Sequence, residues 1–170
     1  MISARPAFVG RAGTRRTSNQ KGDIVYRFIE QTVEDYMTRE VRTVSRDVTM
    51  NELNDLFAVD DFNAYPVVDQ TQMVGLVTKL DFLKCFALTL SSMVPRYDEL
   101  MKRTVADVMT YEFIYVNTAT KLVRVLQLMV EHRLRSIPVL GAGQRLVGII
   151  SREDVMRALR DCTNDGPRAR

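Results

Sequence analysis

Two segments of the chain place a hydroxyl and a carboxylate three residues apart, where a short apolar run passes into a helical pattern. They read Gly75-Leu-Val-Thr78-Lys-Leu-Asp81 and Gly148-Ile-Ile-Ser151-Arg-Glu-Asp154. The N-terminus of a helix offers free N–H groups and a positive dipole end to a phosphate, and the hydroxyl adds a donor. The carboxylate can accept both hydroxyls of a ribose. The pattern indicates a nucleotide site.

A helix capping box has the same spacing, because the hydroxyl caps the first turn and the carboxylate bonds back to the backbone. Taken alone, either segment is interpreted more simply as such a cap. We therefore expect these positions to stabilise helices whether or not they also bind a ligand.

Residues for catalysis or metal binding are scarce. The single histidine, His132, falls in a predicted helix and has no counterpart in the rest of the chain. Cys85 and Cys162 lie far apart and are interpreted as ordinary thiols in a reducing compartment. No metal-ligand spacing, phosphate-binding glycine loop or nucleophile elbow is present. The sequence predicts a binding protein rather than an enzyme, with no metal or cofactor.

The composition excludes several other classes. No apolar stretch reaches the ~18 residues that a membrane span needs, so we expect no membrane association and a cytoplasmic location. The net charge is +3, but five cations precede the first acid, Asp23, and the remainder carries −2. Such a body offers no footprint for nucleic acid. Residues 1–22 are predicted to be a disordered basic tail, with an organelle transit peptide as the alternative.

The elements that position the two segments belong to an internal repeat. Val33-Glu-Asp-Tyr-Met-Thr38 returns 72 residues later as Val105-Ala-Asp-Val-Met-Thr110. The offset becomes 73 at Gly75 and Gly148, so one residue is inserted in a turn within 141–145. The apolar pattern of each copy predicts a short strand, a helix, a two-stranded hairpin and a second helix.

The predicted fold class is therefore α/β (α+β): two βαββα repeats packed as a pseudo-twofold intramolecular pair with two related clefts. We expect repeat 1 over 23–84, a helical linker over 85–104, repeat 2 over 105–160 and a tail over 161–170. The end of repeat 1 and the linker carry apolar residues that we expect to pack on the pair or on a second subunit: Phe82, Phe86, Leu90 and Met93.

The order D-x-M-T, T-V, P-V-V-D, G-L-V-T-x-x-D, given twice over about 33–159, resembles the tandem CBS (cystathionine beta-synthase type) domain pair. The resemblance implies a regulatory module that binds AMP, ADP or ATP, or else S-adenosylmethionine or NAD(H), and signals to a partner protein. It also implies which residues bind: Asp81 and Asp154 the ribose, Thr78 and Ser151 the phosphate. Adenine would lie near Thr43 and Tyr115 and beside Tyr65 and Ile137.

Further phosphate contacts are implied for Arg135, Ser136 and Arg152 in copy two. Copy one has Asn63 and Ala64 in place of the first two, with Asp60 and Asp61 upstream. Because a phosphate is attracted to guanidinium groups and repelled by carboxylates, we expect tighter binding at Ser151 and Asp154. The alternatives are a ligand-free interaction protein and a small nucleotide hydrolase. A twofold repeat with apolar helix faces also predicts a homodimer.

Overall fold

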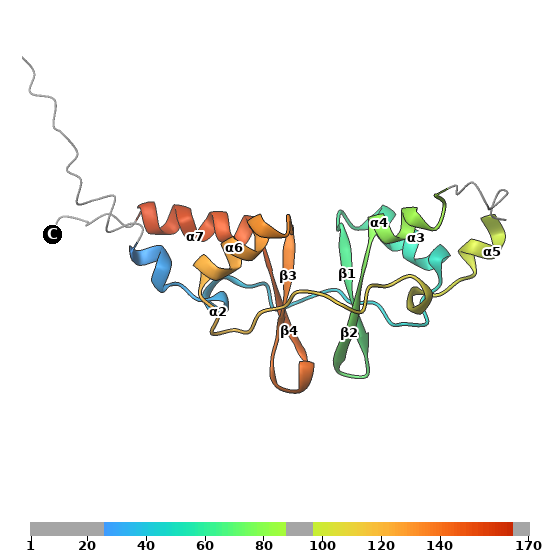
Figure 1. Cartoon of the computed structure of the whole chain (residues 1–170), viewed down its shortest axis with the longest axis horizontal. Coiled ribbons are helices and arrows are strands. Elements are labelled where there is room, and N and C mark those ends of the chain that lie inside the picture. The colour runs from blue at the N-terminus through green and yellow to red at the C-terminus, as the bar shows by residue number, and fades with distance from the viewer. Residues whose placement is uncertain (1–25, 88–96, 165–170) are drawn as a thin grey trace, which may run out of the picture.

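The computed structural model describes residues 26–87 and 97–164. Two antiparallel hairpins stand side by side (Figure 1), each at the centre of one repeat. The first pairs β1 (Ala64–Asp69) with β2 (Gln72–Thr78), and the second pairs β3 (Ser136–Leu140) with β4 (Leu146–Ser151). The inserted residue lies in the second turn, which forms a short 3-10 helix, η2 (Ala142–Gln144), with Gly143 at φ 65°.

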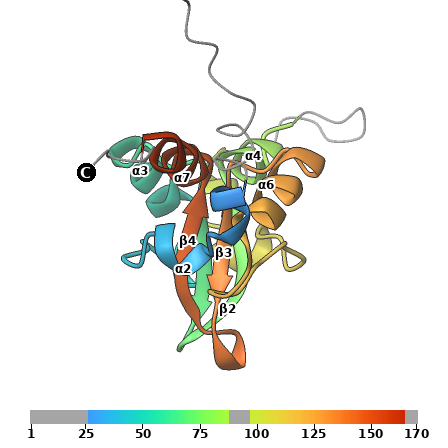
Figure 2. The same cartoon turned by 90° about the vertical axis from the view of Figure 1, so that its left-hand side faces the viewer.

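The main helices lie on one side of the two hairpins (Figures 1 and 2). They are α3 (Met50–Val59) and α4 (Lys79–Lys84) in copy one, and α6 (Leu122–Glu131) and α7 (Arg152–Asn164) in copy two. As the apolar period predicts, α6 buries Leu122, Val125 and Met129, although Val130 is exposed. The shorter helices are α2 (Val33–Tyr36), α5 (Tyr97–Met101) and η1 (Val105–Asp107).

The start of the tail expected over 161–170 is helical. Helix α7 continues to Asn164, because Cys162 is one of its apolar positions and packs, 6% exposed, in the core of copy two. At the other end, the basic segment 1–22 lies outside the described residues.

The expected first strand of each copy is reduced to a single bridge. Val44 pairs in parallel with Val67, and Val116 with Val139. The residues that follow the D-x-M-T motifs, 39–43 and 111–115, connect the two halves without entering a named strand.

The segment that opens each repeat packs on the other repeat. Thr38 bridges to Ile149 of β4, and Thr110 bridges to Leu76 of β2. Phe28, Val33 and Met37 accordingly belong to the core of copy two. Met101, Val105 and Met109 belong to the core of copy one. Neither hydrophobic core follows the repeat boundaries expected from the sequence.

The aromatic residues of the expected linker pack against copy one. Phe82 and Phe86 lie 5.3 Å apart between ring centroids, and Phe86 lies 5.9 Å from Tyr97. Both phenylalanines contact the copy-one core. Leu90 and Met93 lie outside the described residues.

Candidate functional site

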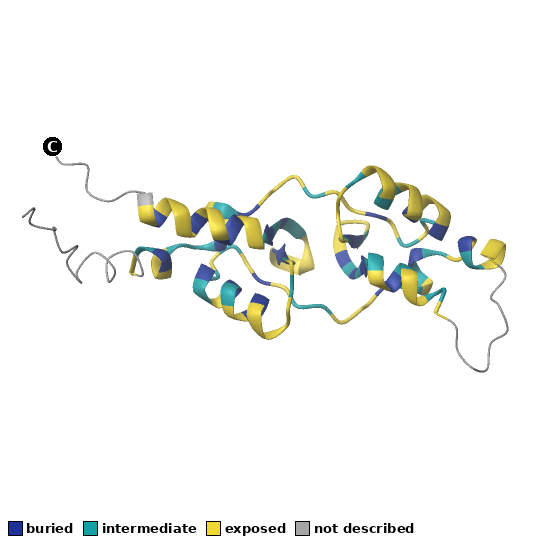
Figure 3. Ribbon diagram, turned by 90° about the horizontal axis from the view of Figure 1, so that it is seen from above, coloured by how far each residue is buried: buried dark blue, intermediate teal, exposed yellow. Residues whose placement is uncertain are grey.

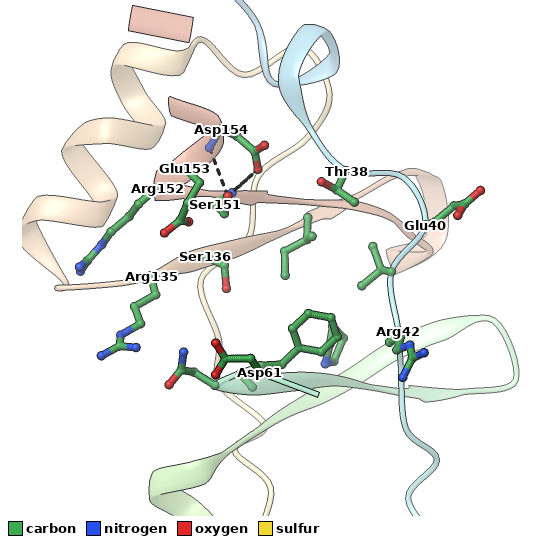
Figure 4. Close-up of a pocket in the computed structure, with 16 residues that line it drawn as sticks. Thr38, Glu40, Arg42, Asp61, Arg135, Ser136, Ser151, Arg152, Glu153 and Asp154 are labelled. Carbon is green, nitrogen blue, oxygen red and sulfur yellow. Dashed lines mark hydrogen bonds between the residues drawn. The ribbon is translucent and has the colours of Figure 1, made fainter. Parts of the chain in front are cut away.

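A cavity of about 520 Å³ lies between the two copies, at the end of β4 and the start of α7. Its volume is within the usual range for small-molecule sites. Copy two contributes the starts of β3 and α7, and copy one contributes the connecting segment and the loop before β1 (Figure 4). The lining residues are Thr38, Glu40, Val41, Arg42, Asp61, Phe62, Asn63, Ala64, Pro66, Arg135, Ser136, Ile149, Ser151, Arg152, Glu153 and Asp154.

Asp154 is buried in the wall of this cavity, with 5% of its surface exposed. Its Oδ2 accepts bonds from the Ser151 amide at 2.8 Å and the Ser151 hydroxyl at 2.7 Å. Its Oδ1 pairs with the Arg157 guanidinium at 2.8 Å. A carboxylate offers about four acceptor sites, so one site on Oδ1 stays open to a ligand hydroxyl.

Ser151 is fully engaged in the capping box. Its hydroxyl donates to Asp154 and accepts from the Asp154 amide at 3.2 Å. The hydroxyl therefore has no hydrogen left for a phosphate while the box is intact. The two positions predicted from the sequence do form a cap, and within this box only Oδ1 of Asp154 has an acceptor site that no described residue uses.

Copy one repeats this arrangement around Asp81. Its Oδ2 accepts from the Thr78 amide and hydroxyl at 3.0 and 2.7 Å, and Lys84 pairs with Oδ1 at 2.8 Å. Burial acts to raise the pKa of Asp81, but the hydrogen bonds from Lys84 and Thr78 outweigh it and lower the pKa below its ordinary value. Neither Thr78 nor Asp81 lines the cavity described above.

The three arginines of the cavity differ in their availability. Arg152 donates to the carbonyls of Leu134 and Arg133 at 2.7 and 3.0 Å, and so holds the loop before β3. Arg42 donates from one nitrogen, Nη1, to both carboxylate oxygens of Asp60, at 2.6 and 2.7 Å. Within the described part of the chain, only the Arg135 guanidinium of these three has no partner.

Four acidic residues line the same cavity: Glu40, Asp61, Glu153 and Asp154. The expectation that Asp61 disfavours phosphate in copy one's site needs correction, because Asp61 lines the cavity of Ser151 and Asp154 (Figure 4). The loop before β1 and the start of β3 face the same cavity, so Asn63 and Arg135 share it. The tighter binding expected at Ser151 and Asp154 therefore cannot be explained by an absence of carboxylates from this site.

The four residues expected near adenine lie elsewhere. Tyr65 and Ile137 are buried, 1% and 0% exposed, and belong to the two cores. Tyr65 donates to Asp60 at 2.7 Å, and burial together with this carboxylate raises its pKa. Thr43 is exposed, and Tyr115 lines a separate open depression beside Phe113.

The residues of copy one that line the cavity at Ser151 and Asp154 were not predicted from the sequence. Thr38, Glu40 and Val41 line this cavity because the segment that opens repeat 1 packs on β4 of copy two. The same repeat pattern would arise if each opening segment stayed with its own copy, so the sequence held no signal for the crossing.

The described residues contain no group of three or more His, Cys, Asp or Glu side chains that could hold a metal ion. In the same part of the chain, no helix is both long and apolar enough to cross a membrane.

A family model described as the CBS domain matches residues 33–88 and 105–161. The chain belongs to the CBS domain family. Both CBS matches begin at the D-x-M-T motif, whose methionine packs on the opposite hairpin: Met37 against Gly148, and Met109 against Gly75. The crossing therefore lies within the family's own boundaries.

Several curated relatives are named CBS domain-containing proteins. The CBS domain-containing protein YhcV of Bacillus subtilis is 32% identical, covering 72% of this chain and 81% of that protein. The chloroplastic CBS domain-containing protein CBSX1 of Arabidopsis thaliana is 28% identical, covering 81% and 67%. Other relatives are longer, and the chain spans 46% of one from Methanocaldococcus jannaschii.

A solved structure of CBSX2 in complex with AMP has the same fold. It superposes with a TM-score of 0.64 at 27% identity and covers 76% of this chain and 96% of that one. Two CBS repeats in a pseudo-twofold pair, as the sequence predicted, are thus the architecture of this protein.

Proposed function

We propose that the cavity at Ser151 and Asp154 binds an adenosine ligand and that a partner protein responds to its occupancy. The observation that carries this proposal is the buried Asp154, which lines a cavity of about 520 Å³ and whose Oδ1 has a single partner, Arg157. The AMP bound by the related CBSX2 supports the ligand class. The vicinal hydroxyls of a ribose are donors suited to this carboxylate.

The charges of the cavity favour a ligand with little negative charge. One uncommitted guanidinium, Arg135, lines the same cavity as the acidic residues Glu40, Asp61 and Glu153. One guanidinium can hold one phosphate through a two-pronged bond, but a triphosphate adds charge that the acids repel. We therefore place AMP and the cationic S-adenosylmethionine ahead of ADP, ATP and NAD(H).

Calorimetry with AMP, ATP, S-adenosylmethionine and NADH tests both statements. We expect AMP or S-adenosylmethionine to bind at least tenfold more tightly than ATP, a difference of about 1.4 kcal/mol. Asp61→Asn should reduce this difference in affinity, while Asp47→Asn, an exposed change outside the cavity, should leave the difference unchanged. Absence of heat and of any rise in melting temperature with all four ligands would leave the ligand-free interaction protein as the better account.

The exposed helix layer supports a second proposal, a homodimer. Figure 3 shows exposed positions along the helices of both copies. Several of the exposed residues on these helices are apolar, between 57% and 81% exposed: Val59, Leu80, Leu83, Val130 and Met156. Leu83 and Met156 occupy equivalent repeat positions, one on each copy, and such a pair suits a symmetric contact with a second copy. Sedimentation of Leu83→Glu/Met156→Glu should give a monomer where the parent chain gives a dimer, and a monomeric parent would contradict it.

A further inference from the structure

The guanidinium of Arg157 connects the cavity to helix α2. One of its nitrogens, Nη2, lies 2.8 Å from Oδ1 of Asp154 and also donates to the Tyr36 carbonyl at 2.8 Å. The Tyr36 carbonyl belongs to the end of α2, where helical carbonyls lack partners and a cation is favourable. A single side chain therefore bonds to both the ligand-facing carboxylate and the segment that crosses from copy one.

One further contact joins Arg157 to Tyr36. The Arg157 guanidinium lies over the Tyr36 ring, 5.8 Å from its centroid. Burial and the nearby Asp161 carboxylate on α7 raise the pKa of the Tyr36 hydroxyl. The Arg157 guanidinium therefore contacts both the backbone carbonyl and the ring of Tyr36.

Copy one lacks this connection. Lys84 takes the position of Arg157 and pairs with Asp81 at 2.8 Å, but the described residues show no bond from Lys84 to the carbonyl of Val108, which replaces Tyr36. An ammonium group is a compact point charge, whereas a guanidinium presents several fixed donors. Only the copy-two carboxylate is joined to the opening segment of the other repeat.

We propose that Arg157 is a positioning residue that couples ligand binding at Asp154 to the docking of α2. This inference rests on the proposed function. A ribose hydroxyl on the open site of Oδ1 leaves Arg157 in place and fixes the carboxylate, so the docked form of α2 binds the ligand more tightly. By linkage, the ligand then stabilises docked α2 by the same factor. Ligand bound in the cavity thereby stabilises the contact between α2 and α7.

Hydrogen exchange of the full chain, with and without AMP or S-adenosylmethionine, tests the coupling. The informative amides are Val33, Glu34 and Met37, which bond to Thr120, Thr118 and Val33 and do not line the cavity. At saturating ligand we expect their exchange to slow about fivefold or more. Arg157→Lys, which copies the Lys84 arrangement, should abolish this slowing and weaken binding by a similar factor. Lys84→Ala is the matched control and should change neither.

The outcomes separate the two proposals. Ligand binding without slower exchange at these amides, or slowing that persists in Arg157→Lys, overturns the coupling and leaves the proposed function standing. No calorimetric heat with either ligand overturns both. A merely structural role for Arg157 predicts faster exchange in the variant with and without ligand, but an unchanged ratio between the two states.

Discussion

At the scale of single residues, the geometry of Asp154 is compatible with both interpretations of its motif. Asp154 lines the cavity and closes a capping box with Ser151, and its Oδ1 retains an acceptor site that no described residue uses. The sequence predicted this residue from spacing alone. It could not predict that Arg152 turns toward two backbone carbonyls and leaves Arg135 as the available cation, because side-chain direction depends on neighbouring loops.

Gly148 shows how closely one residue is fitted. A Cβ at this position would lie 2.8 Å from the Met37 Sδ and 2.9 Å from the Thr38 carbonyl oxygen. Gly148→Ala should therefore displace the crossing segment, lower the free energy of unfolding by about 1–3 kcal/mol and weaken AMP binding, because Thr38 lines the cavity. Urea denaturation and calorimetry measure the two effects.

Gly75→Ala is the matched comparison, since its Cβ would meet the Met109 Sδ at 2.8 Å in copy one. It should destabilise the fold by a similar amount and leave AMP affinity unchanged. Equal losses of affinity in both variants would argue against a site confined to this cavity.

At the scale of elements, the apolar period identified the main helices, and the turn residues identified both hairpins. The first strands were overestimated, because a short apolar run near Val44 or Val116 satisfies the strand pattern with only one bridge. The structure also contains capping boxes that were not predicted from the sequence. Thr32 with Asp35 and Thr104 with Asp107 repeat the motif in the opening segments.

These boxes predict a loss of stability in acid. Hydrogen bonds from Thr32 and Thr104 lower the pKa of Asp35 and Asp107, and those from Lys84 and Thr78 lower that of Asp81 despite its burial. A carboxylate whose pKa is lowered by folding stabilises the fold above its ordinary value of 3.8. That contribution is lost as the pH falls through the folded value.

The free energy of unfolding should accordingly decrease as the pH falls from about 5 to about 2. Urea denaturation over this range gives the slope. Asp81→Asn should make the slope shallower, and Asp47→Asn, outside any capping box, should not. An identical slope in Asp81→Asn and the parent chain would show that this box does not titrate with folding.

At the scale of the whole molecule, the two cores are interdependent. Each is completed by the opening segment of the other repeat, with Met37 in one and Met109 in the other. The internal repeat predicted two related units and a shared axis. It could not predict that each opening segment packs on the other repeat, because the sequence period is the same whether the segment packs on its own repeat or on the other.

The interdependence predicts one cooperative unfolding transition. Met37→Ala and Met109→Ala should each lower the free energy of unfolding by about 2–5 kcal/mol, and each should destabilise both halves. Hydrogen exchange in denaturant, read at Val125 of copy two and Leu53 of copy one, measures this. Exchange that accelerates in only one half would mean that the cores unfold independently.

The central claim is that one cavity, built on Asp154, binds the ligand. Calorimetry of AMP with the parent chain, Asp154→Ala and Asp81→Ala tests it most directly. Loss of the charge-assisted bonds should cost Asp154→Ala about 1.5–3 kcal/mol, or roughly ten- to a hundredfold in affinity, while Asp81→Ala binds like the parent. Equal affinities of Asp154→Ala and the parent chain would contradict the account.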